Sequence, residues 1–142
     1  MQYRKIIIAV VLLSAMFGAF SSETVIAENE SAKCYVFSYE EAFKSGKAVF
    51  VGKVLSEEKR GDTRYFEFEV EKYWKGANKK KIEIGVYETM RYQANFKTGE
   101  RYLIYANANS EGTLSVGRCS RSRTAEQAEE DLDKLGTGKK PD

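Results

Sequence analysis

The 142-residue sequence contains no histidine, one proline and only two cysteines. The lack of histidine excludes a histidine general base, a Ser-His or Cys-His nucleophile pair, and a histidine metal site. Cys34 and Cys119 are too far apart in the chain for a CxxC redox motif or a tetrahedral zinc site. With one proline and scattered glycines, long disorder is not expected before the last few residues. The sequence therefore predicts no catalytic residue, no cofactor and no metal ligand, and we do not expect an enzyme.

Residues 1–27 have the pattern of a secretory signal peptide. Arg4 and Lys5 precede an apolar run from Ile6 to Phe20, and Val25-Ile26-Ala27 supplies small residues at a cleavage site. The run is about 15 residues long, shorter than the roughly 20 of a membrane-spanning helix. We therefore expect a secreted or cell-envelope protein with no membrane span after processing. An uncleaved anchor is the alternative.

Removal of residues 1–27 would leave a chain suited to one domain over 28–136, followed by a disordered tail over 137–142. The full chain has 23 basic and 21 acidic residues. Loss of Arg4, Lys5 and Glu23 would leave 21 against 20, a net charge of +1. A nearly neutral domain lacks the basic footprint of nucleic-acid or membrane binding, so we expect neither partner.

Cys34 and Cys119 are expected to pair, because disulfides are the default state of two cysteines in an exported chain. Two free thiols are the alternative. The bridge would join the start of the domain to its last strand. In the loop-entropy account, a loop of this size stabilises a domain by about 4–5 kcal/mol.

The clearest strand is in the stretch from Arg64 to Gly76. Phe66, Phe68 and Val70 alternate with Glu67, Glu69 and Glu71, as in a strand with one buried and one wet face. The glutamates are the ordinary outer face of such a strand, and we do not interpret them as catalytic carboxylates. Glu71 and Lys81 could pair across the following turn. Similar patterns predict further strands over 48–55, 81–87, 101–106 and 113–117.

Two helices are predicted from capping boxes. Ser38 and Glu41 begin a short helix that should end near Ser45, before Gly46. Thr124 and Gln127 begin a second helix, which Gly136 should end. Its apolar residues follow helical spacing at Ala125, Ala128, Leu132 and Leu135.

Together these elements predict a mainly β protein. Five short strands, a glycine inside the first strand at Gly52 and two flanking helices fit a small five-stranded antiparallel barrel of the oligonucleotide/oligosaccharide-binding (OB) type. Gly52 is expected at a bulge or sharp coil of the strand. A five-stranded α+β sandwich fits the pattern nearly as well.

Four segments in order resemble bacterial members of the netrin-like superfamily, which includes the tissue inhibitors of metalloproteinases. They are CYVFSYEEAFKSGKAVFVGKVL, FEFEVEKYWKG, FKTGERYLIYA and LSVGRCSRSRTAEQAEEDLDKL. The resemblance covers roughly Lys33 to Leu135. It implies an OB barrel that acts as an extracellular protein-binding module, with a protease as one candidate partner. Its candidate surface is Ala32, Lys33, Cys34 and Tyr35.

The sequence departs from the family at its first cysteine. The family begins with Cys-x-Cys, whereas this chain has Ala32-Lys33-Cys34, and the usual partner of the first cysteine is also missing from 88–96. In the animal inhibitors that first cysteine is the amino terminus and chelates the protease zinc. We therefore expect no tight inhibition of zinc proteases by amine chelation.

The alternative function is an OB-type binder of glycan or nucleic acid at the cell envelope. It would draw on Arg118, Arg121 and Arg123, with exposed tyrosines such as Tyr87 and Tyr92, because basic grooves with aromatic rings suit single strands. The simpler interpretation of the arginines is a solvated loop.

Overall fold

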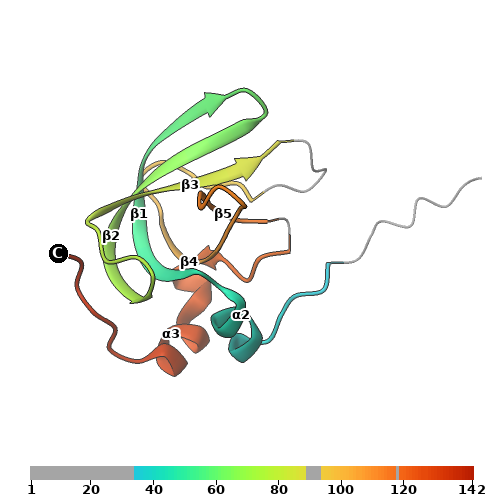
Figure 1. Ribbon diagram of the computed structural model, residues 1–142. Coiled ribbons are helices and arrows are strands. Elements are labelled where there is room, and N and C mark those ends of the chain that lie inside the picture. The colour runs from blue at the N-terminus through green and yellow to red at the C-terminus, as the bar shows by residue number, and fades with distance from the viewer. Residues whose placement is uncertain (1–33, 89–93, 118) are drawn as a thin grey trace, which may run out of the picture. The chain divides into compact units, whose positions relative to one another are not determined.

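Strands close into a barrel in the computed structural model of the chain (Figure 1), which describes residues 34–88, 94–117 and 119–142. The first 27 residues, the predicted signal peptide, lie outside the described part. The elements are α2 (Tyr39–Ser45), β1 (Ala48–Arg60), β2 (Thr63–Lys75), β3 (Lys81–Tyr87), β4 (Arg101–Ala108), β5 (Leu114–Ser115), β6 (Arg123–Thr124), the 3-10 helix η2 (Glu126–Ala128) and α3 (Glu129–Leu135). No helix in the described ranges is long and apolar enough to cross a membrane.

The pairing order β1-β2-β3-β5-β4 closes on itself through a β1–β4 pairing. The predicted five-stranded OB-type barrel, with one helix before it and one after it, is confirmed. The prediction that the barrel is antiparallel throughout needs one correction, because β3 and β5 pair in parallel at Gly85 and Ser115. A closed ring of five strands cannot alternate direction all the way round, so one neighbouring pair has to be parallel.

The hairpin of β1 and β2 is longer than the sequence pattern predicts. The first strand was expected to end at Leu55, yet β1 continues to Arg60 and turns through Gly61-Asp62 into β2. Its last residues are charged and exposed, so no burial pattern marks them, and their pairing with β2 makes them a strand.

Gly52 lies at a shift in the β1–β2 register, as expected for a bulge. A Cβ atom there would lie 2.8 Å from the backbone oxygen of Glu69, so only glycine allows the two strands to approach this closely.

Apolar side chains form two clusters, one inside the barrel and one between its outer wall and the helices. Inside, the ring of Phe96 packs edge-on against Phe66, Phe68 and Tyr102, at centroid distances of 5.0–5.4 Å. Residues of β1 serve both clusters in alternation: Ala48 and Phe50 face inward, and Val49 and Val51 face the helices. The outer cluster contains Ala42, Val49, Val51, Leu103, Tyr105 and Ala128, with Phe43, Trp74, Leu132 and Leu135 packed against it.

The predicted capping box of α2 is present. The backbone N–H of Glu41 donates to Ser38 Oγ, and the backbone N–H of Ser38 donates to Glu41 Oε2 at 2.9 Å. At the second helix only the Thr124 half of the predicted box forms, through a 3.4 Å bond from Gln127 N to Thr124 Oγ1. The chain first makes the 3-10 turn η2, and α3 begins at Glu129.

The prediction of a disordered tail over 137–142 is wrong. Lys139 pairs with Tyr73 of β2 through two backbone hydrogen bonds, and Asp142 N donates to Asn78 O at 2.9 Å. The tail therefore returns along the end of β2 (Figure 1), and Lys33–Asp142 form one compact unit. Nothing in the tail's own polar sequence marks this pairing, because its partners lie about 65 residues earlier in the chain.

Candidate protein-binding edge

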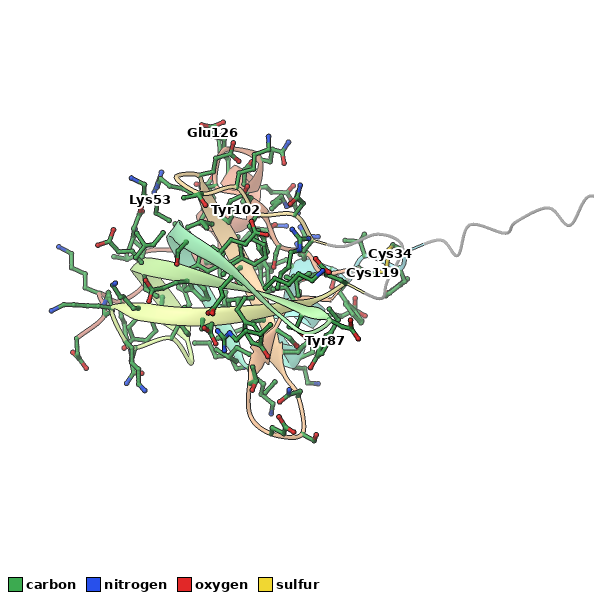
Figure 2. The ribbon with its side chains drawn as sticks, turned by 90° about the horizontal axis from the view of Figure 1, so that it is seen from above. Cys34, Lys53, Tyr87, Tyr102, Cys119 and Glu126 are labelled. Carbon is green, nitrogen blue, oxygen red and sulfur yellow. A yellow bond between two sulfur atoms is a disulfide. The ribbon has the colours of Figure 1, made fainter. Side chains whose placement is uncertain are left out.

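A disulfide joins Cys34 to Cys119, as predicted, with a Cα–Cα distance of 5.2 Å. Figure 2 shows the bridge at the point where the described chain begins. It fastens the segment before α2 to the chain that follows β5. Of the predicted surface residues, Cys34 and Tyr35 lie here, whereas Ala32 and Lys33 are outside the described residues.

Next to the bridge, three consecutive apolar side chains face solvent. Tyr35 is 67% exposed, Val36 55% and Phe37 42%. Apart from Tyr87, they are the exposed large hydrophobic residues of the described part of the chain. The rings of Tyr35 and Phe37 pack edge to face at 5.4 Å. We call Tyr35, Val36 and Phe37 the apolar edge.

The apolar edge is fastened at several points. Cys34 holds its start through the disulfide, and the capping box at Ser38 holds its end. Between them, Arg121 Nη1 donates to the backbone oxygen of Phe37 at 3.1 Å. Backbone and hydroxyl hydrogen bonds from Ser38 lower the pKa of Glu41, so the carboxylate of the cap stays charged. The backbone of the edge is thus held at both ends, whereas its side chains are exposed.

Arg121 takes part in a buried ion pair that reaches the C-terminal helix. Its Nε and Nη2 atoms each lie 2.6 Å from an oxygen of Asp131, and Tyr105 Oη donates to Asp131 Oδ2 at 2.9 Å. Asp131 is 1% exposed. Burial alone would raise the pKa of Asp131, but hydrogen bonds from Arg121 and Tyr105 hold it below its usual range. Burial and the hydrogen bond to Asp131 raise the pKa of Tyr105.

Two of the three arginines predicted for the alternative ligand site, Arg121 and Arg123, have a carboxylate partner within the protein. Arg121 is bound to Asp131, and Arg123 Nη2 lies 3.7 Å from the same carboxylate. The simpler interpretation, a solvated loop, is wrong for Arg121, whose side chain is only 14% exposed. Arg118 and Tyr92 lie outside the described residues. The hydroxyl of Tyr87 accepts a 3.2 Å hydrogen bond from Asn109.

We did not predict a role for Asp131 from the sequence, where it is one of several acidic residues of the second helix. A signal was nevertheless present, because Asp131 follows Ala128 by three residues and precedes Leu135 by four. That spacing places it on the apolar stripe that faces the barrel. An acidic residue on such a stripe requires a buried partner.

A small cavity of about 200 Å³ opens beside the apolar edge. Phe37 forms one wall, and α2, β4 and the chain around Cys119 form the others. Its lining residues are Phe37, Ala42, Ser45, Gly46, Tyr105, Asn107, Gly117, Cys119, Ser120 and Arg121.

On β1–β2–β3, where OB folds hold oligonucleotides, acidic side chains accompany the basic ones. Lys81 Nζ lies 3.1 Å from Glu67, and Arg60 pairs with Glu83 and Glu58. Lys81 was expected to pair with Glu71, but the register sets it opposite Glu69 and diagonal to Glu67. Basic side chains that are already paired with carboxylates attract phosphate groups only weakly.

Glu71 pairs instead with Arg101 of β4, at 2.6–3.0 Å. Within the described ranges, no group of three or more His, Cys, Asp or Glu side chains could hold a metal ion.

No protein-family model matches the sequence, and a search of curated proteins gives no match.

Proposed function

We propose that this protein is a secreted, netrin-like module that binds another extracellular protein through the apolar edge. The observation that carries the proposal is the run of three exposed apolar side chains, Tyr35, Val36 and Phe37, fastened at both ends. Tyr35 belongs both to the surface predicted from the sequence and to the apolar edge. The proposed contact extends from Tyr35 to Val36 and Phe37.

The physical case rests on preorganisation. Protein interfaces depend on a few large side chains, tyrosine prominent among them, that fill pockets on the partner and lose water. Binding is weakened when such side chains first have to be ordered. Here the disulfide, the Arg121 bond to Phe37 and the Ser38 cap order the backbone in advance. The cavity beside Phe37 offers a complementary hollow for a partner side chain.

The netrin-like part of the proposal rests on the sequence resemblance. The resembling segments contain, in turn, α2 with most of β1, most of β2, most of β4, and the chain from β5 to α3. The missing first cysteine still argues against zinc chelation by an amino terminus. We therefore propose recognition by the side chains of the edge.

The test is a pull-down from the culture medium of the source organism with the chain from residue 28 onward as bait. We compare the wild type with the triple variant Tyr35→Ser, Val36→Ser, Phe37→Ser. A matched control, Asp62→Asn with Glu111→Gln, changes two exposed turn residues outside the edge. The wild type and the control should retain the same protein, and the edge variant should lose it while melting at a similar temperature. Equal retention by the edge variant, or nothing retained by the wild type, would contradict the proposal.

A further inference from the structure

A second, larger cavity lies between the barrel wall and the C-terminal helices, with a volume of about 590 Å³. That volume is within the range of small-molecule sites. Figure 2 shows Glu126, one of its residues, well away from the Cys34–Cys119 bridge. We call it the helix cavity; it is lined by Val51, Glu71, Lys72, Trp74, Arg101, Ala125, Glu126, Glu129, Leu132 and Gly136.

The apolar part of the helix cavity comes from the barrel wall, the helix and the only tryptophan of the chain. Val51 and Ala125 are buried, and Leu132 is half-buried beside them. Trp74 Nε1 donates to the backbone oxygen of Gly136 at 3.2 Å. The indole N–H is therefore already used, and the ring offers its carbon surface to an occupant.

The charged part of the helix cavity is not balanced. Glu71, Glu126 and Glu129 stand against Lys72 and Arg101. Arg101 already makes a bidentate ion pair with Glu71, in which Arg101 Nη2 lies 2.6 Å from Glu71 Oε2. Glu71 and, more weakly, Glu126 raise the pKa of the Arg101 guanidinium. With three carboxylates against two cations, the lining has a net charge of −1, so an organic cation meets net attraction and an anion meets net repulsion.

Glu126 is the first residue of η2 and Glu129 the first residue of α3, and both line the cavity together with Trp74. Carboxylates and an indole ring both attract an ammonium group, the ring through its negative face. The apolar residues can meanwhile cover a hydrocarbon body.

We propose that the helix cavity binds a small organic ammonium compound. Its charged nitrogen lies between Glu126 and Glu129, and its hydrocarbon part lies against Trp74, Val51 and Leu132. This site is separate from the apolar edge, so it can be tested independently of the proposed function.

Trp74 makes the test direct, because it is the only tryptophan in the chain. Its fluorescence and its single indole N–H resonance are followed while hexylammonium, hexan-1-ol and hexanoate are added separately. The three probes share one hydrocarbon chain and differ in charge. Hexylammonium should cause a saturable change at about millimolar concentration, as expected for so small a ligand. The neutral and anionic probes should need concentrations at least about tenfold higher.

The double variant Glu126→Gln, Glu129→Gln should weaken hexylammonium binding about three- to tenfold, which is the scale of two partly exposed ion pairs. The control Asp62→Asn, Glu111→Gln makes the same change in net charge at two exposed turns and should leave binding unchanged. Added salt should weaken binding of the cation only. Equal binding of hexanoate, or no saturable change in either Trp74 signal, would overturn the proposal. The probe series on the wild type decides this even if a variant folds poorly.

Discussion

Asp131 and Arg121 are ten residues apart, and together they connect the C-terminal helix to the segment before α2. Asp131 belongs to α3, Arg121 follows the disulfide, and the backbone oxygen of Phe37 accepts from the same guanidinium. The pair is buried on the Asp131 side, where an unpartnered charge would be costly. The residues thus hold the apolar edge and the C-terminal helix against the same region of the barrel.

Replacing Asp131 with Asn should lower the free energy of unfolding by about 3 kcal/mol at neutral pH, because Arg121 loses its counter-charge. The pKa of Asp131 is lowered in the folded state. Its stabilising effect is therefore complete above the unfolded pKa of about 3.9 and disappears as the pH falls through the lower folded value. Urea unfolding of wild type and variant from neutral pH to about pH 3 measures the difference, which should shrink only below about pH 4.

The control for Asp131 is Glu130→Gln at the neighbouring position. Glu130 is exposed and pairs with Lys134 at 2.8 Å, so its loss should change the free energy of unfolding far less than the loss of Asp131. A loss for Asp131→Asn that matches this control, or that is as large at pH 3 as at pH 7, would contradict the assigned role.

At the scale of elements, the C-terminal tail pairs with β2 through one isolated bridge, between Lys139 and Tyr73. Its bridge to Tyr73 brings Gly138 against the ring of Trp74 and the side-chain stem of Lys72. A Cβ atom on Gly138 would lie 2.9 Å from Trp74 Cε2 and 2.7 Å from Lys72 Cγ. The tail therefore supports one wall of the helix cavity, since both contacted residues line it.

Gly138→Ala should detach the tail and shift Trp74 emission toward that of an exposed indole. The matched control is Gly61→Ala, because both glycines have a positive φ, 67° and 60°, but a Cβ atom at Gly61 meets nothing within 4 Å. Both variants carry the cost of alanine in a left-handed conformation. The additional clash at Gly138 should cost about 1–2 kcal/mol more in denaturant unfolding. Equal losses of stability, with unchanged Trp74 emission, would show that the tail does not pack there.

At the scale of the whole molecule, the barrel closes without help from the disulfide, whose two cysteines lie outside the paired strands. The bridge spans a sequence separation of 85 residues and encloses β1 to β5. Its effect on stability therefore comes mainly from restricting the unfolded chain, in the loop-entropy account.

Reduction of the bridge, or the double variant Cys34→Ser, Cys119→Ser, should lower stability by about 4 kcal/mol. For a domain of this size the melting temperature should fall by roughly 15 °C or more. Calorimetry with and without reductant measures the shift, and non-reducing peptide mapping should find one linked pair of peptides. An unchanged melting temperature would mean that the unfolded chain gains little freedom when the bridge is broken.

Much of the fold could be predicted because it is encoded locally. The alternation of Phe66, Phe68 and Val70 with glutamates reports a half-buried strand wherever its partners lie, and the Ser38–Glu41 cap needs no distant residue. The positions of the five barrel strands along the chain followed from such patterns. The pairing of Cys34 with Cys119 followed because no other cysteine was present to compete.

Only the tertiary structure decided which charges are buried, how the tail runs and where hollows remain. The sequence places Asp131 on the apolar stripe of its helix, but only the folded chain shows that Arg121 is its partner, at 2.6 Å. The tail is likewise an ordinary polar end until it meets β2. The helix cavity is a gap between elements, so its shape belongs to no single stretch of sequence. Local patterns report the period and the faces of each element, whereas pairing of distant charges and the space between elements depend on how those faces are packed together.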